Sequence, residues 1–207
     1  MNVIFIGPPG SGKGTMAARI VKRYEMMHIS TGDMLRENMR AGTDLGKLAQ
    51  GYIDKGQLVP DAVIIGMVEK KLLESYGGAL FDGFPRTESQ ATALLKITDI
   101  DAVIELEAPL ELVTARMLTR KVCRKCGKVF STKLYKDNFC DECGGELYHR
   151  SDDEIETIKA RYMVYLETLG NIKKVFEERH LLYTVDADDT VDSIEKKITE
   201  ILDRKLV

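Results

Sequence analysis

The sequence predicts an α/β protein in which a parallel sheet carries helices on both faces. Three observations support this prediction: short uninterrupted apolar runs, helical patterns between those runs, and a glycine-rich loop directly after the first run. Continuous apolar runs are typical of strands buried on both faces, and strands that alternate with helices form parallel sheets. The 207 residues, of which 44% are hydrophobic and 30% charged, suffice for a substantial core in one or two domains.

The expected strands recur at intervals along the chain. Val3–Ile6 is the first, because four apolar residues run without interruption up to Gly7. The other strand candidates are residues 26–29, 79–81, 102–106 and 181–185.

Helical patterns fill the segments between these strands. Residues 14–24 place apolar side chains on one face of a helix. Pro60 and Asp61 suit the first turn of another helix, with Pro60 at the first helical position. Thr190 is a candidate N-cap for the last helix. The apolar stripe of that helix consists of Val191, Ile194, Ile198 and Ile201.

Two stretches interrupt this alternation, and we interpret them as insertions into one core. Residues 30–59 are helical and punctuated by glycine, without a good strand. Residues 119–156 are rich in turn residues and contain all four cysteines. The core would then consist of residues 1–29, 60–118 and 157–207.

A phosphate-binding loop is predicted at Gly7–Thr15, between the first strand and the first helix. Its glycines let successive backbone N–H groups face one anion, and the helix N-terminus adds positive charge. Lys13 brings a full charge for the outer phosphates. Gly14 separates this lysine from Thr15, whereas the general pattern has Ser or Thr directly after the lysine. A simple glycine- and proline-rich turn is the alternative.

Asp82 follows a predicted strand, at the end where parallel sheets bind ligands. A carboxylate at this place can hold Mg²⁺ through water, as an acidic residue of phosphate-loop enzymes does. A turn residue before Gly83 is the alternative.

The four cysteines form two C-x₂-C pairs, a spacing that predicts a zinc ribbon. They are Cys123, Cys126, Cys140 and Cys143. Four thiolates close a tetrahedral site, so the zinc is expected to be structural. The alternatives are redox or disulfide chemistry and a nucleic-acid-binding ribbon. Residues 119–150 carry eight Lys or Arg against four Asp or Glu, a mild excess that equally suits nucleotide phosphates.

Composition argues against two other kinds of partner. The net charge of −3 lacks the basic excess typical of nonspecific nucleic-acid binding. No apolar run approaches the roughly 18 residues of a membrane span, and the first residues do not resemble a signal peptide. We therefore expect a cytoplasmic protein that binds neither membranes nor nucleic acid.

Further motifs accompany the loop along the whole chain. They are Ser30–Arg36, Asp82-Gly83-Phe84-Pro85-Arg86-Thr87, Arg116, Arg120, the cysteine ribbon, Arg150–Asp153 and Arg161. Together with the loop's Gly14-Thr15, these motifs resemble the adenylate kinase family in its form with a long zinc-bearing lid. The resemblance implies a five-stranded parallel sheet with two mobile subdomains, a helical NMP-binding insertion and a lid, at 30–59 and 119–156. It also implies a monomer.

The resemblance further implies reversible phosphoryl transfer from Mg²⁺-ATP to AMP, which gives two ADP. Such transfer depends on positioning and charge neutralisation and needs no side-chain general base. The implied catalytic residues are Lys13, Arg86, Arg120, Arg150 and Arg161. The implied ATP-binding residues are Gly10, Ser11, Gly12, Lys13, Gly14, Thr15, Arg116, Arg120 and Ala187. Ala187 stands where the family has glycine, and a positive φ there would be strained.

The AMP-binding residues that the resemblance implies are Thr31, Arg36, Gln57, Val59, Gly83, Arg86, Gln90, Arg150 and Arg161. Arginine forks suit a phosphate, although a solvated surface position is the alternative for each arginine. Gln90 can pair with one donor and one acceptor of an adenine edge. Thr87 to Gln90 is also a capping box, so a capping role for Gln90 is the alternative. Asp152 and Asp153 suit the first turn of the next helix, while the resemblance suggests that Asp152 orients lid arginines.

Two other functions fit parts of the sequence. A kinase acting on UMP or CMP would share the fold, but such relatives have short lids. A phosphate-loop ATPase or switch coupled to a binding ribbon would not need the second arginine clamp, Arg36 and Arg86.

Overall fold

The computed structural model describes residues 1–75 and 77–206. Its main sheet has five parallel strands in the order β2-β3-β1-β4-β8. They are β1 (Val3–Ile6), β2 (Met27–Ser30), β3 (Ala79–Asp82), β4 (Ala102–Glu107) and β8 (Leu182–Asp186). Every expected strand is present, with ends shifted by at most one residue, so the predicted parallel α/β fold is confirmed.

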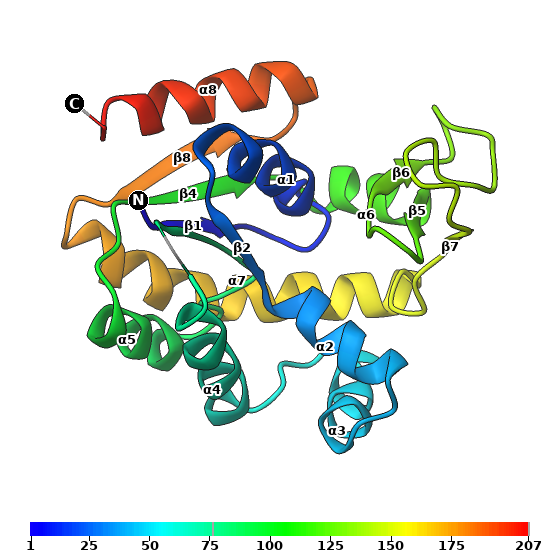
Figure 1. Cartoon of the computed structure of the whole chain (residues 1–207), viewed down its shortest axis with the longest axis horizontal. Coiled ribbons are helices and arrows are strands. Elements are labelled where there is room, and N and C mark those ends of the chain that lie inside the picture. The colour runs from blue at the N-terminus through cyan, green and yellow to red at the C-terminus, as the bar shows by residue number, and fades with distance from the viewer. Residues whose placement is uncertain (76, 207) are drawn as a thin grey trace.

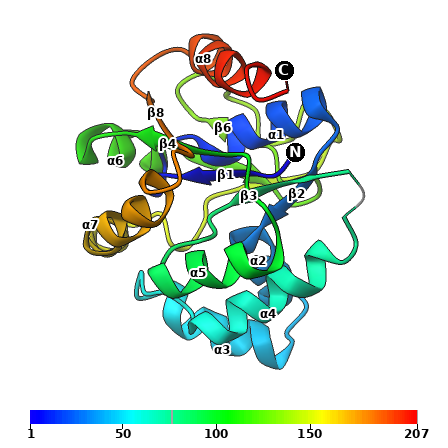
Figure 2. The ribbon, with the colours of Figure 1, turned by 90° about the vertical axis from the view of Figure 1, so that its left-hand side faces the viewer.

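Helices cover both faces of this sheet (Figures 1 and 2). The buried cluster on one face includes residues of α1 (Lys13–Tyr24), α6 (Leu110–Leu118) and α8 (Val191–Asp203). The cluster on the other face includes residues of α4 (Asp61–Leu72), α5 (Glu88–Ile97) and α7 (Ile155–Glu177). None of the helices within residues 1–75 and 77–206 has the length and apolar character that a membrane crossing requires.

The last helix begins as its sequence signal predicts, but the expected place of Pro60 and the expected burial of Val191 are corrected. Thr190 is the N-cap of α8, and its side chain accepts a hydrogen bond from the Ser193 N–H at 3.3 Å. Pro60 precedes the helix as its N-cap instead of taking the first helical position. Val191 was expected in the apolar stripe of α8 but is 40% exposed, and Leu202 is buried instead.

The two irregular stretches have folds of their own (Figure 1). α2 (Thr31–Arg40) and α3 (Asp44–Ile53) pack against each other and join the second cluster through Leu35 and Ala49. The cysteine-bearing stretch holds an antiparallel sheet in the order β6-β5-β7. Its strands are β5 (Arg120–Cys123), β6 (Val129–Ser131) and β7 (Leu147–Tyr148).

A carboxylate lies inside the main sheet, on β4. Glu105 is 1% exposed and accepts hydrogen bonds from Lys173 Nζ at 2.8 Å, Thr184 Oγ1 at 3.2 Å and Tyr165 Oη at 3.3 Å. A buried charge requires such partners because desolvation disfavours it. Glu105 in turn raises the pKa of Lys173 through their hydrogen bond.

Replacing Lys173 by Met is expected to lower the free energy of unfolding by about 2 kcal/mol, since it leaves Glu105 buried without its cation. For a chain of this size, that corresponds to a fall in melting temperature of about 5 °C, measurable by calorimetry. Lys174→Met is the matched control, because Lys174 is the exposed neighbour on the same helix. Equal shifts in the two variants would show that the ion pair contributes no specific stability.

Candidate active site

The loop between β1 and α1 has the conformation that its glycines allow. Gly7 has φ +146°, and a Cβ there would lie 2.5 Å from the carbonyl oxygen of Leu106. Gly12 is the N-cap of α1 with φ +102°, so the helix begins with its free N–H groups at the end of the loop. Lys13 folds back over the loop and donates to the carbonyls of Gly7 and Pro8, both at 2.8 Å. This is the geometry of an anion-binding loop.

Lys13 lies opposite the acidic end of β3. Burial lowers the pKa of Lys13 to about 7, while the charge of Asp82 acts in the opposite direction. Asp82 is 9% exposed, and its Oδ2 lies 3.5 Å from His28 Nε2. A Cβ on Gly14 would lie 3.5 Å from that same oxygen, so the carboxylate borders the loop. Its place at the carboxyl end of a parallel strand fits a ligand site.

Arg86 lies beneath the turn that follows Asp82. Its Nε donates to the Gly83 carbonyl at 2.7 Å, and the Thr31 hydroxyl donates to the same oxygen at 2.8 Å. Burial lowers the pKa of Arg86 to about 10, and the charge of Arg161 acts in the same direction. Three residues that the sequence assigned to AMP are therefore in contact with one another.

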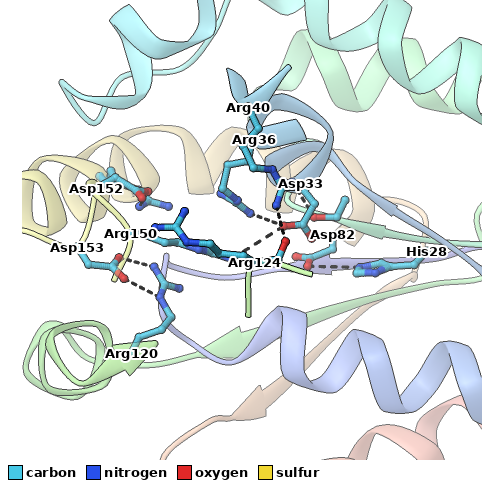
Figure 3. A network of polar contacts seen from close by, with 12 residues as sticks. His28, Asp33, Arg36, Arg40, Asp82, Arg120, Arg124, Arg150, Asp152 and Asp153 are labelled. Carbon is cyan, nitrogen blue, oxygen red and sulfur yellow. Dashed lines mark hydrogen bonds and ion pairs between the residues drawn. The ribbon is translucent and has the colours of Figure 1, made fainter. Parts of the chain in front are cut away.

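Asp33 joins two further arginines, which come from distant parts of the chain (Figure 3). Arg36 Nη2 lies 2.6 Å from Asp33 Oδ1, and Arg150 Nη2 lies 3.9 Å from the same oxygen. Burial acts to raise the pKa of Asp33, but the charge and hydrogen bond of Arg36 outweigh it and lower the pKa to about 2. Arg150 thus connects the cysteine-bearing stretch with α2.

Asp152 and Asp153 correct one expectation. They were expected in the first turn of a helix, but α7 begins at Ile155 with Glu154 as its N-cap, so both precede it. From this position before the helix, Asp153 accepts two hydrogen bonds from Arg120, and Asp152 accepts one from Arg161. Both carboxylates are buried. The partner of Arg120 is therefore Asp153 and not Asp152.

The whole cluster carries an excess of positive charge. Its six cations are Lys13, Arg36, Arg86, Arg120, Arg150 and Arg161, and its four carboxylates are Asp33, Asp82, Asp152 and Asp153. Burial and then the charge of Arg36 lower the pKa of Arg150 to about 10. Arg150 Nε is buried and has no hydrogen-bond partner within the described residues. A polyanion is the ligand that would relieve this repulsion and take up the free N–H.

Arg116 lies on the other side of the loop. It donates to the Ser11 carbonyl at 3.2 Å and to the Ala187 carbonyl at 2.7 Å. Ala187 is fully buried and is absent from the positive-φ residues, so the alanine fits here without backbone strain. Gly10 is another positive-φ residue of the loop, and Thr15 is exposed in the first turn of α1.

The residues expected around the AMP base differ in their burial. Val59 is buried in the second cluster, whereas Gln57 is exposed, and its backbone N–H donates to the Tyr52 carbonyl at 2.9 Å. Gln90 is 2% exposed. Thr87 caps α5 by accepting from the Gln90 N–H at 3.1 Å, so the capping motif is present. The Gln90 side chain, however, bonds the Arg86 N–H and not the N–H of the cap residue.

The four cysteines converge in the small sheet. Their sulfur atoms all lie within 4.8 Å of one another, with Cys123–Cys143 at 3.4 Å and Cys126–Cys140 at 3.6 Å. A tetrahedral site with metal–sulfur bonds of about 2.3 Å has sulfur–sulfur distances of about 3.8 Å. The donor set therefore fits one tetrahedral metal ion, with no position left open.

Sequence reasoning missed several residues of the site. Asp33 lies within the Ser30–Arg36 motif, but no function was predicted for it from the sequence. Its spacing of three residues from Arg36 on a predicted helix was the signal for their ion pair. His28 shares β2 with that motif and faces Asp82. Arg40 donates to the Arg124 carbonyl at 3.1 Å, a contact between α2 and the first cysteine pair for which the sequence gives no signal.

A parallel sheet with a phosphate-binding loop and a cationic cluster at its carboxyl end defines a phosphate-loop nucleotide-binding protein. The sequence profile described as adenylate kinase matches residues 5–181. An adenylate kinase of Archaeoglobus fulgidus is 45% identical over 99% of both chains. One from Kosmotoga olearia is 42% identical over 98% of this chain and 99% of its own, and one from Methanosarcina mazei is 43% identical over 98% of both. The chain belongs to the adenylate kinase family.

Proposed function

We propose that this protein transfers the terminal phosphoryl group of Mg²⁺-ATP to AMP and forms two ADP, in a reversible reaction. The observation that carries this proposal is the cluster of six cations around the phosphate loop. One loop with one lysine would suffice to bind a single triphosphate. Arginines on α2, after β3, in the lid and on α7 supply a second phosphate site facing the first.

The chain's own residues would catalyse the reaction by alignment and charge neutralisation. Lys13 and the loop N–H groups hold the outer phosphates of ATP, with Arg116 and Ala187 beside its base. Arg36 and Arg86 hold the phosphate of AMP, while Arg120, Arg150 and Arg161 neutralise the group in transit. Asp152 and Asp153 position two of these arginines through the contacts described above. No side-chain base is required, because the phosphate of AMP is already ionised.

Two metals fit the residues present. Asp82, buried at the border of the loop, is suited to orient the water shell of a magnesium ion. When bound with ATP, magnesium neutralises charge on the phosphates. The four thiolates are suited to a structural zinc ion. Thiolate ligands must stay reduced, which favours the cytoplasm, and both nucleotide sites lie within one chain, which suits a monomer.

Residues 30–59 and 119–156 would act as two covers, over AMP and ATP respectively, on a core of residues 1–29, 60–118 and 157–207. Closure excludes water and so prevents hydrolysis of ATP. It also completes the arginine cluster only when both substrates are present. The contacts Arg150–Asp33 and Arg40–Arg124 join the two stretches, as expected of two covers that meet over one site.

The acceptor is tested by supplying Mg²⁺-ATP with AMP, UMP, CMP, GMP or water and by counting the nucleoside diphosphates formed. We expect rapid ADP formation with AMP and little product with the others. Preference for a pyrimidine would retain the fold and the phosphate sites but contradict the proposed acceptor. Equal loss of ATP in every reaction, including water, would identify an ATPase.

A further inference from the structure

Gln90 is held by Asp61, which lies outside the cationic cluster, and by the backbone of Arg86, whose side chain belongs to that cluster. Its Nε2 donates to Asp61 Oδ1 at 2.7 Å, and its Oε1 accepts from the Arg86 backbone N–H at 2.8 Å. Asp61 is in the first turn of α4, and its other oxygen accepts from the Thr87 hydroxyl at 2.8 Å. Both oxygens of this carboxylate are thus directed at the turn that carries Gln90.

The chemistry of these neighbours allows one orientation of the amide. An ionised carboxylate only accepts hydrogen bonds, and a backbone N–H only donates. Rotating the amide by half a turn would place Oε1 against Asp61 Oδ1 and Nε2 against the Arg86 N–H. Two hydrogen bonds would become two repulsions in a site where Gln90 is 2% exposed. The two hydrogen-bond partners therefore determine the orientation of the Gln90 amide.

The fixed amide retains one free N–H and one free oxygen lone pair for a ligand. Adenine offers the complementary pair, because its 6-amino group donates and its N1 accepts. A 6-oxopurine reverses both groups, since O6 accepts and N1–H donates, and would need the rotated amide. We propose that Asp61 is a specificity-determining positioning residue, which fixes Gln90 so that the acceptor site takes 6-aminopurine and rejects 6-oxopurine nucleotides. This inference rests on the proposed function, in which Gln90 faces the acceptor base.

The unmodified protein provides a first test with two AMP analogues. Purine riboside 5′-monophosphate lacks the 6-amino group but keeps N1 as an acceptor, whereas inosine 5′-monophosphate has O6 and N1–H. A fixed amide makes one bond with the former and meets two mismatches with the latter. We expect kcat/KM for the purine riboside nucleotide to exceed that for the inosine nucleotide by about tenfold or more. A freely rotating amide would make two bonds with the inosine nucleotide, so equal or better use of it would overturn the inference.

Asp61→Asn is the second test, because an amide at this position can donate as well as accept and so removes one of the two constraints on Gln90, while the Arg86 N–H still disfavours the rotated amide. The ratio of kcat/KM for AMP to that for inosine monophosphate is expected to fall by about tenfold, the contribution of one constraint to base discrimination. Glu88→Gln is the matched control. It removes a first-turn carboxylate from the adjacent helix, and Glu88 is exposed. The control is expected to keep the wild-type ratio.

A structural role and a specificity role have different outcomes. If Asp61 only stabilises the turn, Asp61→Asn lowers kcat/KM for both acceptors by the same factor, and the unchanged ratio overturns the inference. If the variant does not fold, as judged by its thermal unfolding, the comparison of analogues on the unmodified protein decides alone. Failure of AMP itself as an acceptor would refute the proposed function, and this result is separate from a failure of the ratio.

Discussion

Replacing Lys13 by Met is expected to reduce turnover with Mg²⁺-ATP and AMP by about a thousandfold. Lys13 is the cation that the loop itself supplies, and its Nζ is held by two loop carbonyls at 2.8 Å until a phosphate replaces them. Methionine has a similar length without the charge, so the loop should keep its shape. Single-turnover and steady-state rates measured at saturating nucleotide would separate lost chemistry from lost binding.

Lys22→Met is the control for this prediction, because Lys22 is exposed on the same helix. It should keep the wild-type rate and melting temperature. A Lys13→Met protein that retained more than a tenth of wild-type turnover would contradict the role given to the loop lysine.

The lowered pKa of Lys13 predicts that nucleotide binding is coupled to the uptake of a proton. In the free protein burial lowers the pKa of Lys13 to about 7, so at about pH 8 the amine is mostly neutral. Bound phosphates favour the charged form and raise this pKa, so ATP should bind with uptake of close to one proton at that pH. Below the free-protein pKa the amine is already charged, and uptake should vanish. Calorimetric titration in buffers of different ionisation enthalpy measures the proton, and Lys13→Met should show none.

Much of the core could be predicted because its signals are local. Val3–Ile6 is fully apolar, buried on both faces and ended by a glycine that only a tight loop explains. Thr190 caps α8 as its residue type suggests. The phosphate loop combined strand, glycines, lysine and helix in one short segment, so its position followed from the sequence. These features depend on neighbours in the chain and not on tertiary packing.

The strands of the cysteine-bearing stretch could not be predicted for the opposite reason. β7 has only two residues, and β5 begins with the charged pair Arg120-Lys121. Neither shows the apolar alternation that marks a strand. Their pairing follows the cysteine turns, the first of which ends β5 at Cys123 and the second of which precedes β7.

The acidic residues of the site show a second reason why parts of the structure could not be predicted from the sequence. Asp152 and Asp153 resemble helix-start carboxylates, since local sequence does not reveal that Arg161 and Arg120 compete for them. The bond between Asp61 and Gln90 joins α4 to α5 across 29 residues. A capping box was visible at Thr87, yet the decisive partner of its glutamine lies on another helix. Such pairings arise only when the sheet places separate elements together.

Removing the metal from the cysteine cluster is expected to unfold the cysteine-bearing stretch and lower the melting temperature by about 10 °C or more. The apolar core of this small sheet consists of Cys123, Phe130, Cys140 and Leu147, with Tyr135 and Cys143 packed against it. Half of these residues are the metal ligands themselves, so little hydrophobic burial remains without the ion. Calorimetry, metal analysis and limited proteolysis of the chelator-treated protein would measure the change. Cleavage should appear first within residues 119–156.

The turnover of the metal-free protein distinguishes a structural role of the metal from a catalytic one. Four thiolates leave no open coordination position, so a gently prepared metal-free protein should keep part of its activity at temperatures where the core stays folded. The double variant Cys140→Ser, Cys143→Ser serves as the control, because chelator should have no further effect on it. A metal-free protein that stays fully folded but loses all turnover would assign the ion a chemical role. We expect the folding free energy of so small a sheet to come from the bound ion. An unchanged melting temperature would contradict this expectation and show that the cysteine-bearing stretch is stable without the metal.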